Sequence, residues 1–153
     1  MTVGFAQKAM FFDRQAVIDA VGRANARNLL RAGSFIRRSA RSSLRRRKRI
    51  SAPGEPPSVH AQDRTATLKN IWFVFERRRA SVVVGPLRLG SRAPRDSNRA
   101  TIPELLELGG SAVLERRRPE RRRRVAYAPR PFMGPALRRE LPKFQGLWAD
   151  SVK

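Results

Sequence analysis

Few residues in this sequence could carry chemistry, and they do not form a recognisable catalytic set. His60 is the only histidine and there are no cysteines, which excludes thiol catalysis, disulfides and Cys-based zinc sites in this chain. No Ser-His-Asp triad can be assembled with confidence around one histidine in a proline-rich stretch. Glu104 and Glu107 share a predicted helix face, but Glu104 is expected to cap that helix. We therefore predict no enzyme activity and no catalytic, cofactor-binding or metal-binding residues.

Arginine dominates the chemistry of the chain. Its 153 residues include 34 Lys and Arg against 12 Asp and Glu, a formal net charge of +22. Such a chain repels itself unless an anionic partner is close, with nucleic acid, an acidic protein surface or an anionic membrane as the candidates. The excess of arginine over lysine favours bidentate contacts to phosphate or carboxylate groups.

One set of arginines recurs at helical spacing between residues 13 and 45, where a long basic helix capped by Asp13 is predicted. Apolar residues gather on one face of this helix and arginines on another. The apolar set is Val17, Val21, Ala24, Ala32, Phe35 and Ile36. The arginine set, called the arginine stripe below, is Arg23, Arg27, Arg31, Arg38, Arg41 and Arg45. Asp19, four residues before Arg23, is the one acid at i,i+4 from the stripe. Because the other stripe arginines have none, we interpret the stripe as a contact surface and a candidate subunit interface. A solvated helix face is the alternative, and Gly33 is expected to bend the helix.

A second set of arginines surrounds Pro119-Glu120, between predicted strands at about 112–117 and 122–127. This arginine tip consists of Arg116, Arg117, Arg118, Arg121, Arg122, Arg123 and Arg124. Strands do not need arginine for their own stability, so the tip is predicted to face something negative. The alternative is an edge hairpin that its charge keeps soluble.

The elements that must position these residues predict a single α+β domain spanning residues 1–153. The long helix (13–45) precedes a proline-rich loop (51–66). Region 67–128 holds an antiparallel sheet of about four strands and a short inserted helix (101–108). A C-terminal helix, from about 135 to 141, and a tail complete region 129–153. Phe144, Leu147 and Trp148 in that tail are expected to dock on a core or on a neighbour.

Local patterns support these elements. Ile71, Phe73 and Phe75 alternate with Trp72 and Val74, as in a strand with two different faces. A turn "RRRA" and a second strand "SVVVG" complete a hairpin. The inserted helix begins with a Thr-x-x-Glu capping box at residues 101–104 and ends at Gly-Gly.

Targeting signals are not evident in this sequence. No stretch approaches the roughly 18 apolar residues of a membrane span, and the first residues lack the order of a signal peptide. A cytosolic origin with no membrane partner is the expectation.

Three motifs, in the order of the predicted elements, resemble the tail-completion proteins of tailed phages. These are the neck, or head–tail joining, components of long-tailed phages, prophages and gene transfer agents. The motifs are "ARSSLRRRKRISAPGEPPSVH" followed by "TLKNIWF", then "ELLELGG", then "YAPRPFMGPAL". The resemblance covers roughly residues 14–150. Its motif residues are Pro53, Gly54, Glu55, Pro56, Pro57, His60, Gly109, Gly110, Arg130, Pro131, Phe132 and Met133, followed by Pro135, Ala136 and Leu137. The chain departs from the family in lacking a Thr-Gly pair after the histidine and in having Leu108 where an aromatic residue is common.

The resemblance implies a structural virion protein of the phage neck, made in the host cytoplasm. Copies would form a ring, with six as the expected number, between the head connector and the tail-terminator or tail-tube proteins. The rigid loop would hold the angle between an interface helix and the sheet. The arginines would either line a channel for genomic double-stranded DNA or meet acidic surfaces of neighbouring subunits.

Two other classes fit the charge. A ribosomal or other RNA-binding protein would contact phosphates through the arginine clusters, although the sequence has no base-reading module. A DNA-condensing protein would explain the charge but not the apolar hairpin.

Overall fold

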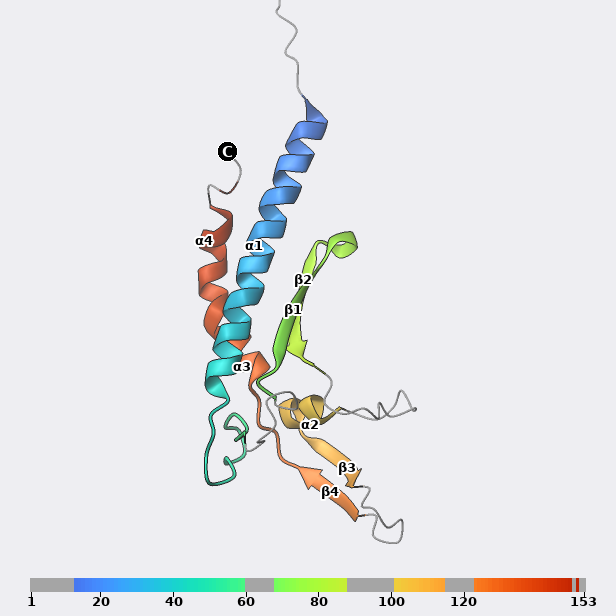
Figure 1. The fold of residues 1–153 in the computed structure, drawn as a ribbon, viewed down its shortest axis with the longest axis vertical. Coiled ribbons are helices and arrows are strands. Elements are labelled where there is room, and N and C mark those ends of the chain that lie inside the picture. The colour runs from blue at the N-terminus through green and yellow to red at the C-terminus, as the bar shows by residue number, and fades with distance from the viewer. Residues whose placement is uncertain (1–12, 60–67, 88–100, 115–122, 150, 152–153) are drawn as a thin grey trace, which may run out of the picture.

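The computed structural model describes residues 13–59, 68–87, 101–114, 123–149 and 151. Its central element is the long helix α1 (Arg14–Ser43), which packs against one hairpin and against the C-terminal helices (Figure 1). The molecule is elongated, with α1 along the upper part and a second hairpin at the opposite end. The predicted α+β class and the long N-terminal helix are confirmed.

The two ends of α1 are set by side chains that bond to its backbone. The Asp13 carboxylate accepts a hydrogen bond from the Ala16 N–H at 2.9 Å, so the predicted N-cap is confirmed. At the other end, the Ser42 and Ser43 hydroxyls donate to backbone carbonyls three residues earlier, each at 2.8 Å. These local bonds compete with further helix. The backbone of Leu44 is extended, so Arg45 lies beyond the helix rather than on it.

Gly33 allows close packing between α1 and the first hairpin. The helix continues through this position. A Cβ added there would lie 2.9 Å from Val82 Cγ2 and 3.1 Å from Phe73 Cδ2. The absence of a side chain therefore lets the first hairpin approach the axis of α1 closely.

The first hairpin forms as predicted. Strand β1 (Ile71–Glu76) pairs antiparallel with β2 (Ser81–Pro86), with Phe73 opposite Val84. The three arginines between them form the short 3-10 helix η1 (Arg77–Arg79), and Ala80 closes the turn at φ 45°. Ile71 is fully buried, whereas Trp72 and Val74 are exposed. The alternation expected for a strand with one covered face is therefore present.

The second hairpin forms a separate sheet, which corrects the prediction of one sheet of about four strands. Strand β3 (Gly110–Leu114) pairs only with β4 (Arg123–Tyr127), and β1 pairs only with β2, among the described residues. Helix α2 (Ile102–Leu108) lies between the two hairpins (Figure 1). Gly109 and Gly110, both with positive φ, turn the chain directly from α2 into β3 on the far side of that helix. The strands therefore start too far from β1 and β2 to join them.

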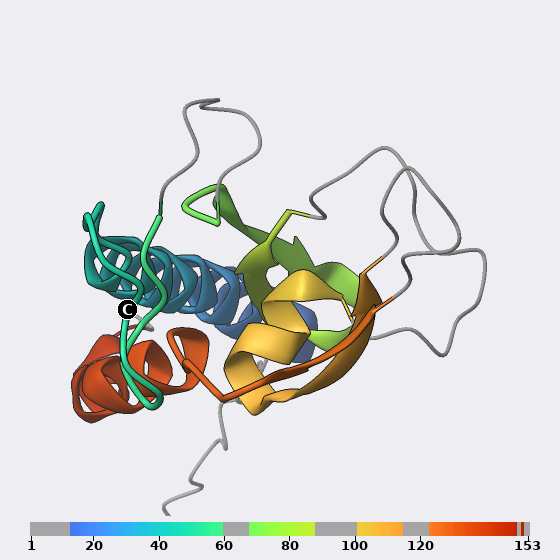
Figure 2. The ribbon, with the colours of Figure 1, turned by 90° about the horizontal axis from the view of Figure 1, so that it is seen from below.

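Three short helices close the described chain. Helix α3 (Met133–Glu140), the 3-10 helix η3 (Leu141–Lys143) and α4 (Phe144–Trp148) follow one another beside α1, on another side from the β1–β2 hairpin (Figures 1 and 2). Trp148 Nε1 donates to Asn25 Oδ1 of α1 at 3.2 Å. The tail thus docks on this chain's own long helix rather than on the core.

The core lies where the C-terminal half of α1 meets β1 and α3. Its buried residues are Ala40, Leu44, Val59, Ile71, Phe132 and Ala136. Two residues of the predicted apolar face of the helix are exposed, Val17 by 44 % and Val21 by 48 %. They lie in the first turns of α1, which project beyond the other labelled elements (Figure 1).

Candidate interface on the long helix

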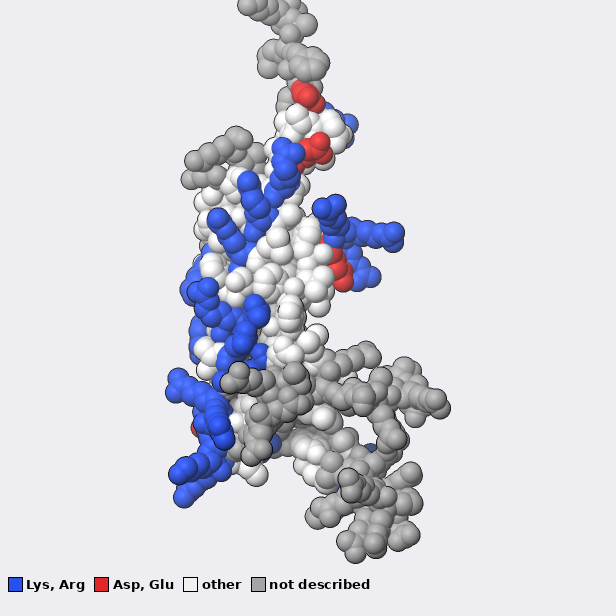
Figure 3. All heavy atoms as spheres, in the orientation of Figure 1, with Lys and Arg blue, Asp and Glu red and all other residues white. Residues whose placement is uncertain are grey.

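The arginine stripe occupies one exposed face of α1. At about 100° per residue, its five helical members fall within roughly 80° of one another. All five are exposed, and so is the sixth, Arg45, in the segment after the helix. Basic side chains follow one another along α1 in the face shown by Figure 3. The structure therefore brings the stripe together as a single elongated surface.

The rest of the fold determines which face of α1 carries the stripe. The buried residues of the helix, Ala24, Asn28, Ala32, Gly33, Ile36, Ser39 and Ala40, occupy the broad face away from it. Most of these side chains are small, which allows the hairpin and α3 to approach the helix closely. The arginines are left on the uncovered side, where long charged side chains remain solvated.

The stripe has no acidic partner within the part of the chain that the structure describes. The ion pairs there are Arg47 with Glu55, Arg79 with Glu76, and Lys143 with Glu140. None of them includes a stripe arginine. An uncompensated row of guanidinium groups attracts phosphate or carboxylate groups from outside the chain.

Arg37 differs from the stripe arginines because the fold already uses it. Its Nε donates to the Ile71 carbonyl at 2.8 Å, and its guanidinium lies 5.7 Å from the centre of the Trp72 ring. This arrangement joins α1 to the start of β1 and includes a cation–π contact. Arg37 is therefore a structural residue, distinct from the candidate interface.

Most of the predicted arginine tip lies outside the described residues. Arg116, Arg117, Arg118, Arg121 and Arg122 belong to segment 115–122, and nothing in the structure tests their predicted role. Arg123 lies opposite Leu114 in the β3–β4 ladder. Arg124 is exposed, and its Nε donates to Ser111 Oγ on the neighbouring strand at 3.2 Å.

The proline-rich loop is fastened to the segment that precedes α3. Gly54, with φ +83°, donates its N–H to the Pro129 carbonyl at 2.8 Å. Arg130 Nε donates to the Ser51 carbonyl at 3.0 Å. Of the remaining loop residues, Pro53 is exposed, Pro56 is half-buried and Pro57 is buried. His60 and residues 61–66 lie outside the described part. The first and third sequence motifs are thus in direct contact.

Glu107 connects the second motif to the third, a role that the sequence did not indicate. Its carboxylate accepts hydrogen bonds from the N–H groups of Phe132, Met133 and Gly134 at 2.8, 3.0 and 2.7 Å. These amides belong to the N-cap and first turn of α3, which has no side-chain cap of its own. A negative charge at this end of a helix is favourable. Phe132 at the N-cap of α3 cannot cap the helix with its own side chain. This is the sequence signal that could have suggested a capping residue from elsewhere in the chain.

The other motif residues pack around these contacts. Phe132 is 1 % exposed and lies in the core, Pro131 and Met133 are half-buried, and Met133 contacts the core. Glu104 completes the predicted capping box with Thr101, its N–H donating to Thr101 Oγ1 at 3.4 Å. It therefore serves α2 and does not form an acidic pair with Glu107.

No group of three or more His, Cys, Asp or Glu side chains within the described ranges is placed to hold a metal ion. Likewise, none of the helices in those ranges is both long and apolar enough to cross a membrane.

Comparisons of the chain with models of known protein families, with curated proteins and with solved structures found no match.

Proposed function

We propose that this protein is a structural component of the neck of a tailed phage or related particle. Its copies assemble into a ring that completes the tail and joins it to the DNA-filled head. The sequence motifs suggest this role, and their contacts support it. Glu107, Gly54 and Arg130 bind the three motifs to one another. Motifs that pack as one unit are stronger support for a family resemblance than three unconnected segments would be.

The observation that carries the assembly role is the exposure of the apolar residues in the first turns of α1. Val17, Ile18 and Val21 are 44, 50 and 48 % exposed. They continue the helix face that is buried against the hairpin and α3 farther along. Three adjacent β-branched side chains on a projecting helix form a patch suited to contact with another protein surface. A neighbouring copy covers this patch in the proposed ring, through a head-to-tail contact that closes on itself.

The arginine stripe supplies the second contact of a neck subunit. Its exposed guanidinium groups have no acidic partner among the described residues, so they face either acidic surfaces of adjacent neck and tail proteins or the DNA that passes through the ring. Both partners present oxyanions that arginine binds in a bidentate manner. Either contact weakens as the salt concentration rises.

The test combines the variants Val17→Glu and Val21→Glu in one chain. The gene is deleted in the strain that forms the particles and is replaced by this double variant or by the wild type. We expect the wild type to restore joined particles. The double variant should lower their number by about tenfold or more, because two charges would enter an apolar contact. Electron microscopy should then show separate filled heads and tails.

Ile50→Glu is the matched control, because Ile50 is 79 % exposed and lies away from the patch. It should restore joined particles, and all three proteins should have similar free energies of unfolding. Full restoration of joined particles by the double variant would refute the proposed contact.

An RNA-binding role is the alternative, favoured by the length and exposure of the arginine stripe. Ribosomal and other RNA-binding proteins use such basic surfaces to contact phosphates. Sedimentation of host extracts after nuclease treatment, in low and high salt, separates the two roles. Co-migration with tails and complete particles that survives high salt supports the neck role, whereas co-migration with ribosomal particles supports RNA binding.

A further inference from the structure

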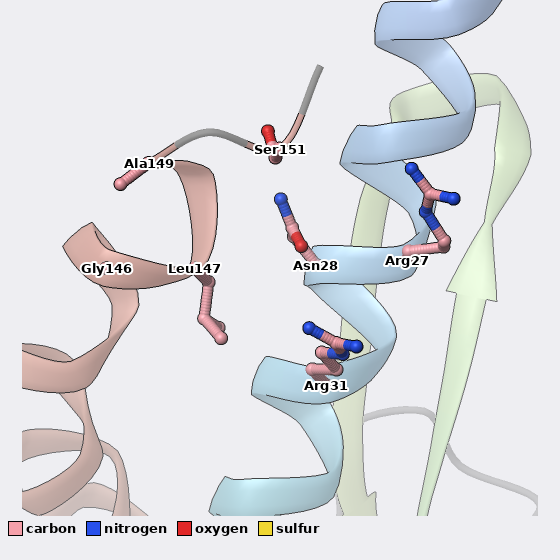
Figure 4. A pocket seen from close by; sticks show the side chains of 7 residues that line it. All are labelled: Arg27, Asn28, Arg31, Gly146, Leu147, Ala149 and Ser151. Atoms are coloured by element: carbon pink, nitrogen blue, oxygen red, sulfur yellow. The ribbon is translucent and has the colours of Figure 1, made fainter. Parts of the chain in front are cut away.

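A hollow of about 620 Å³ lies between α1 and the end of the described chain. Its walls include Arg27, Asn28 and Arg31 on α1, and Leu147, Ala149 and Ser151 on the facing segment. The bond from Trp148 Nε1 to Asn25 Oδ1 holds that segment beside the helix. Figure 4 shows Asn28 projecting from α1 toward the segment, with Arg31 about one turn along the helix and Arg27 farther from the segment in this view.

Asn28 is the unexplained residue of this hollow. It is 4 % exposed, and its Nδ2 donates no hydrogen bond within the described part of the chain. A buried amide without a partner opposes folding, and asparagine is also a poor residue for a helix interior. Leucine or alanine would serve both the helix and its packing better. The unused donor, which points into the hollow in Figure 4, indicates a ligand that accepts hydrogen bonds.

The charges around the hollow specify the chemistry of that ligand. Arg27 and Arg31 are exposed and form no ion pair with a described acid. No Asp or Glu is among the residues described as lining the hollow. Two guanidinium groups, one amide N–H₂ and the Ser151 hydroxyl together form a set of donors. Such a set binds a polyoxyanion, which accepts several charge-assisted hydrogen bonds at once.

We propose that this hollow is a binding site for a phosphate group, with Asn28 Nδ2 as its buried donor and with Arg27 and Arg31 supplying its positive charge. The proposal does not depend on the neck function. The phosphate belongs either to a free phosphate or nucleotide or to the backbone of DNA, and the recognising chemistry is the same in both cases.

The experiment measures binding of inorganic phosphate by calorimetry at constant ionic strength, with chloride as the replaced anion. Wild type is compared with Asn28→Leu, with the pair Arg27→Gln and Arg31→Gln, and with the control pair Arg38→Gln and Arg41→Gln. The control removes the same charge from the same stripe, away from the hollow. We expect the first two variants to bind phosphate about tenfold more weakly or worse, and the control to bind like the wild type.

The unfolding temperature is the second measurement, and it shows whether Asn28→Leu binds phosphate poorly because the variant is less well folded. In chloride alone, Asn28→Leu should unfold at the same temperature as the wild type or higher, because it removes an unpaired buried amide. A lower unfolding temperature would show that Asn28 already has a structural partner and would overturn the proposal. Equal phosphate affinity in all four proteins, or no saturable binding by the wild type, would also overturn it.

Titration with a short random-sequence DNA duplex identifies the source of the phosphate. If the Arg27 and Arg31 pair weakens duplex binding more than the control pair does, the site holds a backbone phosphate. If both pairs weaken duplex binding equally while only the first loses inorganic phosphate, the site holds a free phosphate or nucleotide. Both results support the proposed chemistry.

Discussion

At the residue scale, the Glu107 carboxylate joins α2 to the start of α3. It accepts three hydrogen bonds from the start of α3 and so determines where α2, α3 and the glycine turn meet. A Cβ added at Gly134 would lie 3.0 Å from Glu107 Oε1. Position 134 therefore needs a residue without a side chain. The contact replaces the local N-cap that α3 lacks.

We expect Glu107→Ala to lower the free energy of unfolding by about 2–3 kcal/mol, because three amide groups lose a charged acceptor. Glu107→Gln should lose less, since one oxygen still accepts. Glu76→Ala is the control: it removes an acid whose ion pair with Arg79 is long, at 3.8 Å, and should change stability by about 0.5 kcal/mol or less. Urea unfolding followed by circular dichroism measures all three. If Glu107→Ala and Glu76→Ala lowered the free energy of unfolding equally, the Glu107 cap would stabilise the protein no more than an exposed ion pair does.

At the scale of elements, α1 owes its close fit against the first hairpin to one glycine. Small buried residues along the helix, including Ala32, Gly33 and Ala40, face β1, β2 and α3. Gly33 meets the hairpin directly, whereas Gly22 lies near the free end with nothing within 4 Å of an added Cβ. Glycine is therefore needed for close packing at position 33, whereas at position 22 no packing contact requires it.

We expect Gly33→Ala to lower the free energy of unfolding by about 1–3 kcal/mol, because the new methyl group would press on Val82 and Phe73. Gly22→Ala should raise it by about 0.5–1 kcal/mol, since alanine is the better helix former and nothing opposes it there. Chemical denaturation of both variants measures the contrast. If Gly33→Ala stabilises the protein as much as Gly22→Ala does, the close packing is not required.

At the scale of the whole molecule, charge opposes folding of an isolated copy. The net charge of +22 comes with few compensating contacts. The described ion pairs of Arg47, Arg79 and Lys143 all lie off the stripe. Repulsion between like charges destabilises a compact state and is reduced by salt. An anionic partner that neutralises the stripe would have the same effect as salt.

We expect the unfolding temperature to rise by a few degrees when sodium chloride is raised from low to moderate concentration. A variant with glutamine at five stripe positions should be more stable than the wild type in low salt and should respond less to added chloride. Those positions are Arg23, Arg27, Arg31, Arg38 and Arg41. Differential scanning fluorimetry across a salt series checks both statements. A fall in the unfolding temperature with salt would show instead that attractive ion pairs dominate.

The sequence by itself was sufficient for features that neighbouring residues decide. The Asp13 cap, the Thr101 capping box, the alternation along Ile71–Glu76 and the Gly109-Gly110 helix end all depend on contacts a few residues apart. The spacing of the stripe arginines on one face also follows from helix geometry alone. For such features the local physics and the final structure agree.

Only the tertiary structure decided which surfaces are covered and which elements meet. The two hairpins form separate sheets because α2 and its glycine turn lie between them. Val17 and Val21 are exposed while Ala24 and Ala32 are buried, because packing depends on which elements reach each turn of α1. Glu107 acquires its capping role from backbone groups 25 or more residues away. Asn28 lines a hollow between segments that are distant in the sequence. These features depend on packing between residues that are far apart in the sequence, and local sequence patterns do not predict such packing.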